Sequence, residues 1–230
     1  MTVTVDLKQL AQRSERELES APAEEIVRWA VQTFGSRFAV ASSMQDAVLV
    51  HLVSQVAPGV DVLFLDTGYH FGETLGTRDA VAATYEVNLI TLTPRQTVAE
   101  QDASHGRQLH DRDPDLCCEL RKVAPLNRAL VRYDAWATGL RRVETPTRAS
   151  TPVVSYDARQ GKVKVAPMAT WSDQDVEDYI AAHGILINPL LTSGYQSIGC
   201  APCTRAVSSG EDPRAGRWTG LIKTECGIHR

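Results

Sequence analysis

Two short apolar segments, each followed by small polar residues and then by a helical pattern, constrain the fold of this 230-residue chain most strongly. Residues 37–41 are followed by Ser42-Ser43, and residues 60–65 are followed by Asp66-Thr67-Gly68. Apolar segments without strict alternation are typical of strands buried on both faces of a mostly parallel sheet. The sequence therefore predicts an α/β protein with a doubly wound, mostly parallel sheet.

Other segments fit the same architecture. Residues 6–33 carry apolar side chains at helical spacing, interrupted at residues 21–23, and predict two amphipathic helices. Farther along, we expect a helix over about residues 73–85, strands over 87–92, 135–140 and 162–165, and a helix capped by Ser172.

Regular patterning ends near residue 205. Residues 206–220 contain three glycines and one proline with little periodicity, which is typical of a mobile segment. We therefore divide the chain into one domain, residues 1–205, and a mobile C-terminal tail, residues 206–230.

The charge is distributed unevenly along the chain. The net charge of −4 gives no overall attraction for nucleic acid or for an anionic membrane. Residues 121–148, however, contain seven basic and two acidic side chains, a local charge of +5. A basic stretch inside an acidic protein favours a small anionic ligand over a polymer.

The sequence has no signal-peptide pattern and no apolar run of transmembrane length, so we expect a cytoplasmic protein. Thiols stay reduced in that compartment, which makes a disulfide framework unlikely there. The five cysteines are therefore expected to serve metal binding or catalysis.

Polar residues follow the two strands that define the fold. Ligands of open α/β sheets bind at the carboxyl ends of the strands, where backbone N–H groups favour anions. Ser42 and Ser43 after the first strand, and Asp66, Thr67 and Gly68 after the second, are expected to line one crevice. Ordinary turn and capping chemistry is the alternative for either group alone. Together with the basic stretch, they favour a nucleotide.

Four cysteines form a possible ligand set: Cys117 and Cys118 are adjacent, and Cys200 and Cys203 form a C-x-x-C pair. Soft thiolates favour iron–sulfur clusters and zinc. If the first pair is helical, Lys122 lies one turn from Cys118, where its charge would offset that of a thiolate cluster. Buried free cysteines and a structural zinc are the alternatives, and we favour a cluster.

The fifth cysteine, Cys226, lies near the C-terminus among Lys223, His229 and Arg230. Nearby cations favour the reactive thiolate. Arg214 and Arg217 on the same tail suggest that the tail closes over an anion. An incidental terminal cysteine is the alternative.

Taken together, these motifs resemble those of the assimilatory adenylyl-sulfate reductases, members of the phosphoadenylyl-sulfate reductase family, over about residues 37–229. Residues 65–68 are similar to the family's nucleotide loop, residues 137–142 to its arginine motif, and residues 223–229 to its signature tail. Residues 42–47 depart from the Ser-Gly-Gly-x-Asp-Ser loop of related ATP-cleaving enzymes, which argues against ATP pyrophosphatase chemistry.

The resemblance implies an adenine-nucleotide α-hydrolase-like fold and a [4Fe-4S] cluster on Cys117, Cys118, Cys200 and Cys203. Cys226 would attack the sulfur of adenosine 5′-phosphosulfate, expel AMP and carry an S-sulfocysteine, which thioredoxin would resolve through a transient mixed disulfide. The implied substrate-binding residues are Ser42, Ser43, Asp66, Thr67, Gly68, Lys122, Arg141, Arg142, Arg214, Arg217 and His229.

Two alternatives stay open at this point. One is reduction of the 3′-phosphorylated nucleotide, although in this family the cluster cysteines accompany adenylyl sulfate. The other is a zinc-stapled nucleotide-binding module without redox chemistry, in which Cys226 is incidental. The sequence leaves the oligomeric state undetermined, and a homo-oligomer is compatible with it.

Overall fold

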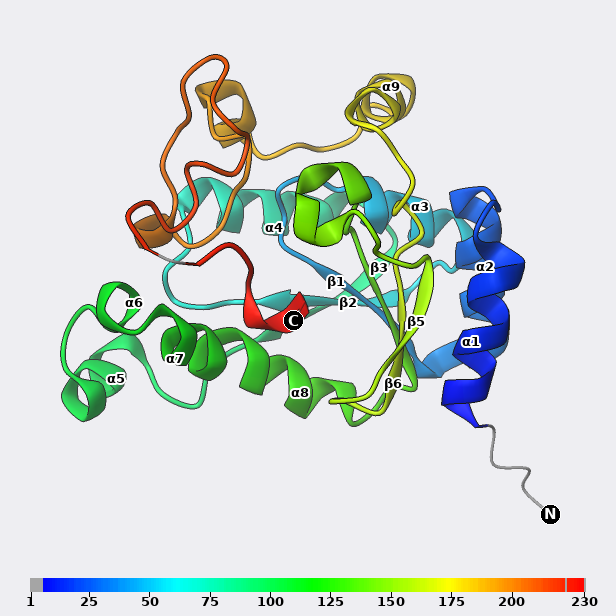
Figure 1. The fold of residues 1–230 in the computed structure, drawn as a ribbon, viewed down its shortest axis with the longest axis horizontal. Helices are drawn as coiled ribbons and strands as arrows, with labels where there is room; N and C mark the ends of the chain where they lie inside the picture. The colour runs from blue at the N-terminus through cyan, green and yellow to red at the C-terminus, as the bar shows by residue number, and fades with distance from the viewer. Residues whose placement is uncertain (1–5, 222, 230) are drawn as a thin grey trace.

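The computed structural model describes residues 6–221 and 223–229. In this part of the chain, six strands form one sheet in the order β3-β2-β1-β4-β6-β5 (Figure 1). The strands are β1 (Phe38–Ser42), β2 (Val60–Leu65), β3 (Val87–Leu92), β4 (Ala135–Thr138), β5 (Val154–Asp157) and β6 (Lys162–Val165).

The sheet is parallel except at one edge, where β5 runs antiparallel to β6. The chain builds outward from β1 through β2 to β3, and then returns to place β4 on the other side of β1. The reversal between β1 and β4 is the position at which open α/β sheets bind ligands, beyond the carboxyl ends of their strands.

Helices cover both faces of the sheet, with α3 and α4 on one side and α8 on the other (Figure 1). The α-helices are α1 (Leu7–Leu18), α2 (Ala23–Phe34), α3 (Val48–Val56), α4 (Gly72–Thr84), α5 (Val98–His105), α6 (Leu109–Arg112), α7 (Pro114–Cys118), α8 (Ala124–Leu130) and α9 (Asp173–His183). Short 3-10 turns lie at Gly35–Arg37, Arg142–Glu144, Pro146–Arg148, Pro189–Ser193, Ala201–Cys203 and Gly227–His229.

Several helix boundaries follow directly from capping residues. The Ser172 hydroxyl accepts a hydrogen bond from Asp175 N at 3.1 Å, and the Asp175 carboxylate accepts one from Ser172 N at 2.7 Å. This capping box satisfies free N–H groups at the start of α9 and confirms the cap predicted from the sequence.

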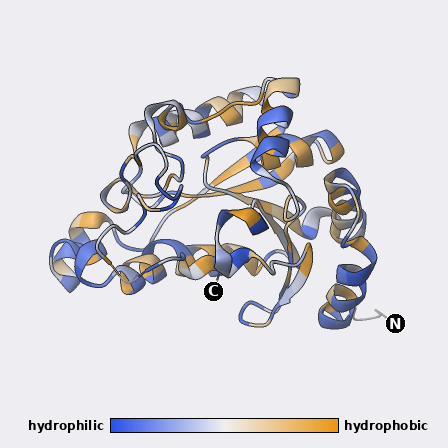
Figure 2. Ribbon diagram, turned by 45° about the horizontal axis from the view of Figure 1, so that its top comes forward, coloured by the Kyte–Doolittle hydropathy of each residue, from blue (hydrophilic) through white to orange (hydrophobic). Residues whose placement is uncertain are grey.

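The strands alternate their side chains between two apolar layers. Val40, Val62 and Phe64 pack into the layer that contains α2 and α3, whereas Leu63 and Trp136 pack against α8. Full burial of such side chains contributes about 1.5–3 kcal/mol each. Figure 2 shows the matching concentration of hydrophobic residues in the central strands.

The C-terminal tail returns to the sheet (Figure 1). Trp218, Lys223 and Cys226 are all buried, and Ile228 packs beside the α8 layer. The tail is therefore seen in an inward position, and its mobility stays a prediction. No helix in residues 6–221 and 223–229 is long and apolar enough to cross a membrane.

Candidate active site

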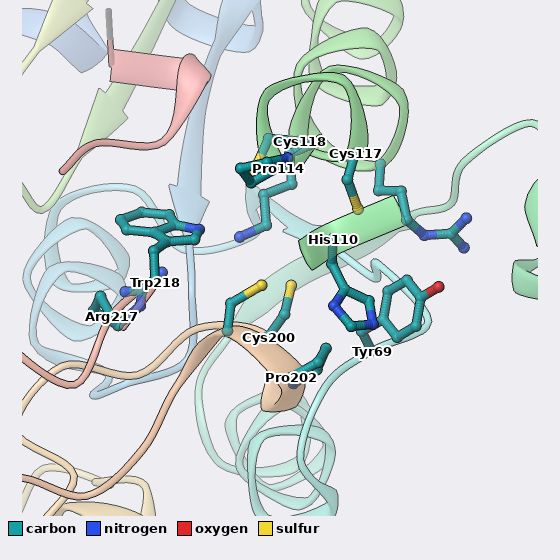
Figure 3. A pocket seen from close by; sticks show the side chains of 12 residues that line it. Tyr69, His110, Pro114, Cys117, Cys118, Cys200, Pro202, Arg217 and Trp218 are labelled. Atoms are coloured by element: carbon teal, nitrogen blue, oxygen red, sulfur yellow. The ribbon is translucent and has the colours of Figure 1, made fainter. Parts of the chain in front are cut away.

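The four predicted ligand cysteines line one pocket (Figure 3). Cys117 and Cys118 end helix α7, whereas Cys200 caps the 3-10 turn Ala201–Cys203 and Cys203 ends it. The same pocket is lined by the charged or aromatic side chains Tyr69, Arg121, Lys122, Arg217 and Trp218. Tertiary packing thus brings together two cysteine pairs that are far apart in the sequence.

The two adjacent cysteines point to different partners. Cys117 interacts with Cys200 across the pocket, whereas Cys118 forms a hydrogen bond with Cys226. Burial and the neighbouring Cys200 thiol raise the pKa of Cys117 to about 11, and the pKa of Cys203 is raised to about 11 for the same reasons. These thiols are therefore protonated at neutral pH until a metal ion displaces the protons.

The side chains that line this pocket have the right chemistry for a cluster, but their present arrangement leaves no space for one. Four thiols are a suitable donor set for an iron–sulfur cluster, and the partly buried Lys122 would offset its negative charge. The free volume between them is about 10 Å³, room for roughly one water molecule. Cys200 Sγ also lies 3.3 Å from Thr67 Oγ1. Cluster binding would therefore require Cys118 to leave Cys226, whereas the Thr67 hydroxyl could still donate to the Cys200 sulfur. Accordingly, no group of three or more potential ligand side chains converges on a metal position within the described residues.

Lys122 reaches the pocket from an unusual turn. Residues Glu119–Val123 form a π-helical turn between α7 and α8, a distortion that is frequent at functional sites. Burial alone would lower the pKa of Lys122, but the thiols of Cys200, Cys226 and Cys118 raise it above its ordinary value. Lys122 is therefore a partly buried cation between the four-cysteine pocket and Cys226.

Cys226 is buried at 8% exposure and carries the features of an activated thiol. The hydrogen bond from Cys118 holds the pKa of Cys226 well below its ordinary value, and Lys122, the Ile228 N–H and Arg217 act in the same direction. A thiolate rather than a thiol is the nucleophilic form of cysteine. This site can therefore deliver a sulfur nucleophile.

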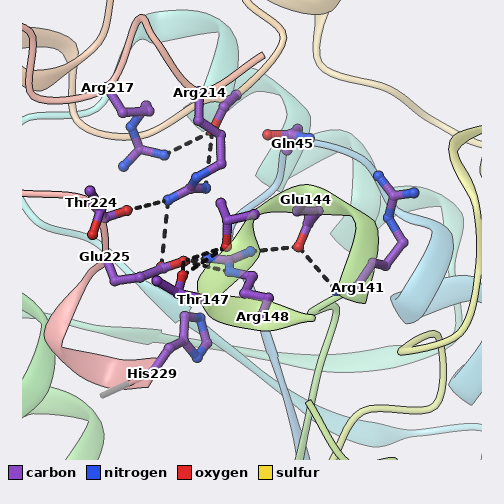
Figure 4. Close-up of polar contacts among 12 residues, drawn as sticks. Gln45, Arg141, Glu144, Thr147, Arg148, Arg214, Arg217, Thr224, Glu225 and His229 are labelled. Carbon is purple, nitrogen blue, oxygen red and sulfur yellow. Dashed lines mark hydrogen bonds and ion pairs between the residues drawn. The ribbon is translucent and has the colours of Figure 1, made fainter. Parts of the chain in front are cut away.

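A network of arginines and carboxylates joins the tail to the domain (Figure 4). The Glu225 carboxylate accepts hydrogen bonds from Arg148 Nε and Nη2, both at 2.7 Å. Arg214 donates to the Thr224 carbonyl at 3.0 Å, and Arg217 donates to Ser197 Oγ at 3.2 Å. Sequence reasoning counted Arg148 only as part of the basic stretch and did not consider Glu225.

A larger cavity of about 450 Å³ lies between the tail residues Thr224, Glu225 and His229 and the residues around β5 and β6. Leu140 and Ala166, which follow β4 and β6, form part of its wall. Its polar lining consists of Thr147, Arg148, Ser150, Thr151, Ser155, Lys164, Thr224, Glu225 and His229. The cavity therefore combines the carboxyl ends of two strands with cationic side chains.

His229 closes one side of this cavity. Its ring stacks on Trp136 with centroids 6.4 Å apart, and Nδ1 lies 3.4 Å from Lys164 Nζ. Burial, together with the charges of Lys164 and Arg148, holds the pKa of His229 well below its ordinary value. The imidazole is therefore neutral at neutral pH.

The polar residues at the ends of β1 and β2 make mainly local contacts. Ser42 Oγ accepts a hydrogen bond from Met44 N at 3.3 Å, and Ser43 is exposed. Asp66 accepts from Gly68 N at 3.0 Å. Thr67 connects this strand end to the four-cysteine pocket through Cys200. None of these five residues lines the larger cavity, and their binding of substrate stays a prediction.

The two arginines of the predicted arginine motif form separate ion pairs. Arg141 Nη2 lies 2.8 Å from Asp173, and Arg142 Nη1 lies 2.7 Å from Glu19. Arg142 also donates to the Thr151 carbonyl at 2.8 Å. Neither arginine lines the four-cysteine pocket or the larger cavity, so their binding of substrate also stays a prediction.

The fold and the site define a doubly wound α/β protein with a thiol-rich site beyond the carboxyl ends of its strands. Residues 37–206 match the model of the phosphoadenosine phosphosulfate reductase domain. The chain belongs to this family, which confirms the resemblance seen in the sequence.

Curated relatives match nearly the whole chain. A protein from Streptomyces coelicolor is 67% identical over 226 residues, covering 98% of this chain and 96% of the relative. A protein from Mycolicibacterium smegmatis is 58% identical, covering 97% of this chain and 95% of the relative. Both relatives are named adenosine 5′-phosphosulfate reductase.

Solved structures confirm the predicted fold. The phosphate complex of phosphoadenylyl-sulfate (PAPS) reductase from Candida auris superposes with a TM-score of 0.75 at 28% identity, covering 88% of this chain and 98% of that structure. Candida glabrata FMN adenylyltransferase, bound to FAD and pyrophosphate, has a TM-score of 0.57 at 11% identity and covers 90% and 78%. This second likeness extends to the fold alone.

Proposed function

We propose that this protein reduces adenosine 5′-phosphosulfate to sulfite and AMP, with Cys226 as the nucleophile and thioredoxin as the reductant. The observation that carries the proposal is the buried thiol of Cys226, which has the cations of Lys122 and Arg217 beside it. Curated relatives between 52% and 67% identical are named for this substrate.

The nucleotide is proposed to bind at the strand ends, near Ser42, Ser43 and residues 66–68. Its phosphosulfate would face the cations around the tail, namely Lys122, Arg148, Arg214 and Arg217, together with the neutral imidazole of His229. The cavity of about 450 Å³ beside Arg148 and His229 supports the position of the phosphosulfate end, because small-molecule sites typically measure about 300–1,000 Å³.

In the first step, the Cys226 thiolate attacks the sulfur of the phosphosulfate. A new S–S bond forms while the bond between sulfur and the bridging oxygen breaks, and AMP leaves with that electron pair. Lys122 and Arg217, which lie beside Cys226, would stabilise the charge that shifts in this step. The product is an S-sulfocysteine at Cys226.

In the second step, a thiolate of reduced thioredoxin attacks the Cys226 sulfur and sulfite leaves. The second thioredoxin thiol then resolves the mixed disulfide and returns Cys226 as a thiolate. Thioredoxin is oxidised by two electrons and sulfur is reduced by two, so the electrons balance. Because Cys226 is buried beside Cys118, the tail has to open for this step.

Cys117, Cys118, Cys200 and Cys203 are proposed to hold a [4Fe-4S] cluster. When bound, the cluster would supply structural order and local charge at this pocket, since thioredoxin already provides both electrons. The requirement for reduced thiols and thioredoxin also favours a cytoplasmic location.

The 3′-phosphorylated nucleotide is the second candidate substrate, because the Candida auris structure is that of a PAPS reductase. Its 28% identity is well below that of the relatives named for the unphosphorylated substrate. Thioredoxin-dependent sulfite release from equal concentrations of the two nucleotides tests the proposal. We expect a strong preference for adenosine 5′-phosphosulfate, and a preference for the 3′-phosphorylated nucleotide would overturn this assignment.

A further inference from the structure

Glu225, the residue before the proposed nucleophile, is held by an arginine from the opposite side of the site. Its two carboxylate oxygens accept separate hydrogen bonds from Arg148, each 2.7 Å long. Both side chains are only 11% exposed. Such a paired contact is the geometry in which arginine recognises a carboxylate or a phosphate group.

The surroundings of Glu225 contain more positive than negative charge. Arg214 lies 3.5 Å from the Glu225 carboxylate, and Lys164 lines the same cavity. Glu144, 2.5 Å from Arg148, is the second carboxylate of the cluster. Asp157 also acts on Lys164, but Glu225 is the carboxylate that contacts both Arg148 and Arg214.

These cations also repel one another, which adds to the effect of burial on their pKa values. Burial and the charge of Arg148 lower the pKa of Arg214, and the same two causes act to lower the pKa of Lys164. Cations that destabilise one another in a buried site favour an anion between them. In the present structure, that anion is supplied by the chain itself.

We infer that Glu225 is a tethered stand-in for the substrate's anion, which the phosphosulfate group must displace from Arg148 and Arg214. This inference rests on the proposed function. A phosphosulfate offers more acceptor oxygens than one carboxylate, and so can satisfy both arginines together. Glu225 therefore acts as a positioning residue rather than a catalytic one.

Displacement of Glu225 has a direct consequence for the thiol. Because Glu225 and Cys226 are adjacent in the chain, release of the carboxylate frees the turn that carries the nucleophile. Arrival of the anion thereby permits Cys226 to approach the sulfur. Substrate binding and thiol positioning are coupled through one ion pair.

Nucleotide binding to chains that carry Cys226→Ser tests this inference, because that background prevents the reaction. In this background, Glu225→Gln keeps the side-chain shape and removes the competing charge. We expect calorimetry to show about tenfold tighter binding of adenosine 5′-phosphosulfate, within the usual range of coupling between sites. Glu225→Asp keeps the charge and should bind more weakly than Glu225→Gln.

Two controls make the test specific. Glu211→Gln removes a carboxylate from the same tail, but Glu211 pairs with Arg205 outside the cavity, so affinity should not change. Adenosine lacks the anion and should bind the parent and the Glu225→Gln chain equally. Circular dichroism establishes that the variants are folded.

The outcomes separate this inference from the proposed function. If the parent chain binds the nucleotide and Glu225→Gln binds it equally or more weakly, the stand-in role is wrong while the proposed function survives. An equal gain for adenosine would also contradict the stand-in role, because no anion is displaced. If no chain binds the nucleotide, both the inference and the proposed function fail.

Discussion

The thiol of Cys118 donates a hydrogen bond to the thiol of Cys226, so the fifth cysteine lies directly against the four-cysteine pocket. From the sequence, these were two separate features, a metal-ligand set and a nucleophile on a tail. Lys122 connects them, because Cys118, Cys200 and Cys226 all act on its pKa. The proposed ligand set and the proposed nucleophile are therefore one site.

Replacement of Lys122 by alanine should reduce turnover by about 10²–10³, the usual effect of removing one charged stabilising group from an active site. The physical reason is that Lys122 is a partly buried cation beside Cys226. Steady-state sulfite release measures the effect, and visible absorption tests whether the iron–sulfur group remains.

Lys8→Ala is the matched control, because Lys8 is an exposed lysine on α1. It should leave turnover unchanged. Wild-type turnover in Lys122→Ala would remove Lys122 from the proposed mechanism, and loss of visible absorption would assign it a structural role instead.

Protein purified without oxygen should be brown and contain iron bound by the four cysteines. Cys117→Ser and Cys200→Ser should each lose most of the iron, because each removes one thiol from the pocket. Metal analysis measures the iron content, and visible absorption measures the colour of each protein. A colourless protein with stoichiometric zinc would instead favour the zinc-stapled module.

The free energy of unfolding should fall as the pH drops below about 6.5. Burial is the first cause that lowers the pKa of His51, His70 and His229 in the folded chain. The pKa values of these three histidines in the folded chain lie below the unfolded value of 6.5. Once the pH falls through 6.5, the unfolded chain therefore binds more protons than the folded chain. Above that value, the three groups make no pH-dependent contribution.

Urea unfolding at pH 7.5 and pH 5.5 measures this dependence. His51→Gln should reduce it, because the partly buried His51 ring, which lies 2.8 Å from the Tyr179 hydroxyl, would no longer titrate. Stability that rises on acidification over this interval would contradict the argument.

Leu130, the last residue of α8, and Val131, which caps that helix, provide a direct test of the apolar layer. Leu130 is 1% exposed and packs against the sheet, whereas the next residue, Val131, is 73% exposed. Leu130→Ala should lower the free energy of unfolding by about 2–5 kcal/mol. Val131→Ala should change it by no more than about 0.5 kcal/mol. Equal effects in urea unfolding would contradict the packing described for α8.

The sequence predicted the strands that are buried on both faces, because their apolar residues form continuous runs. Strands β1, β2 and β3 lie where those runs predicted them. Strand β5 was not predicted, since its four residues, Val-Ser-Tyr-Asp, are short and only partly buried at the sheet edge. The π-helical turn at Glu119–Val123 was not predicted either, because the pattern there fits an ordinary helix equally well.

The candidate site also contains residues that the sequence predicted and residues that it did not. Local motifs marked the four ligand cysteines, Cys226 and Lys122, whereas the pairing of Arg148 with Glu225 joins residues 77 positions apart. No periodicity or spacing rule connects two such positions. The inward placement of the tail likewise depends on tertiary contacts, such as the burial of Trp218 and Cys226.

The most direct test of the central claim is a search for the S-sulfocysteine at Cys226. Protein is incubated with adenosine 5′-phosphosulfate in the absence of thioredoxin, and its peptides are then analysed by mass spectrometry. The account predicts one added SO₃ group on Cys226, one equivalent of AMP, and release of sulfite when reduced thioredoxin is added. Sulfite release by Cys226→Ser, or the same adduct on a different cysteine, would contradict it.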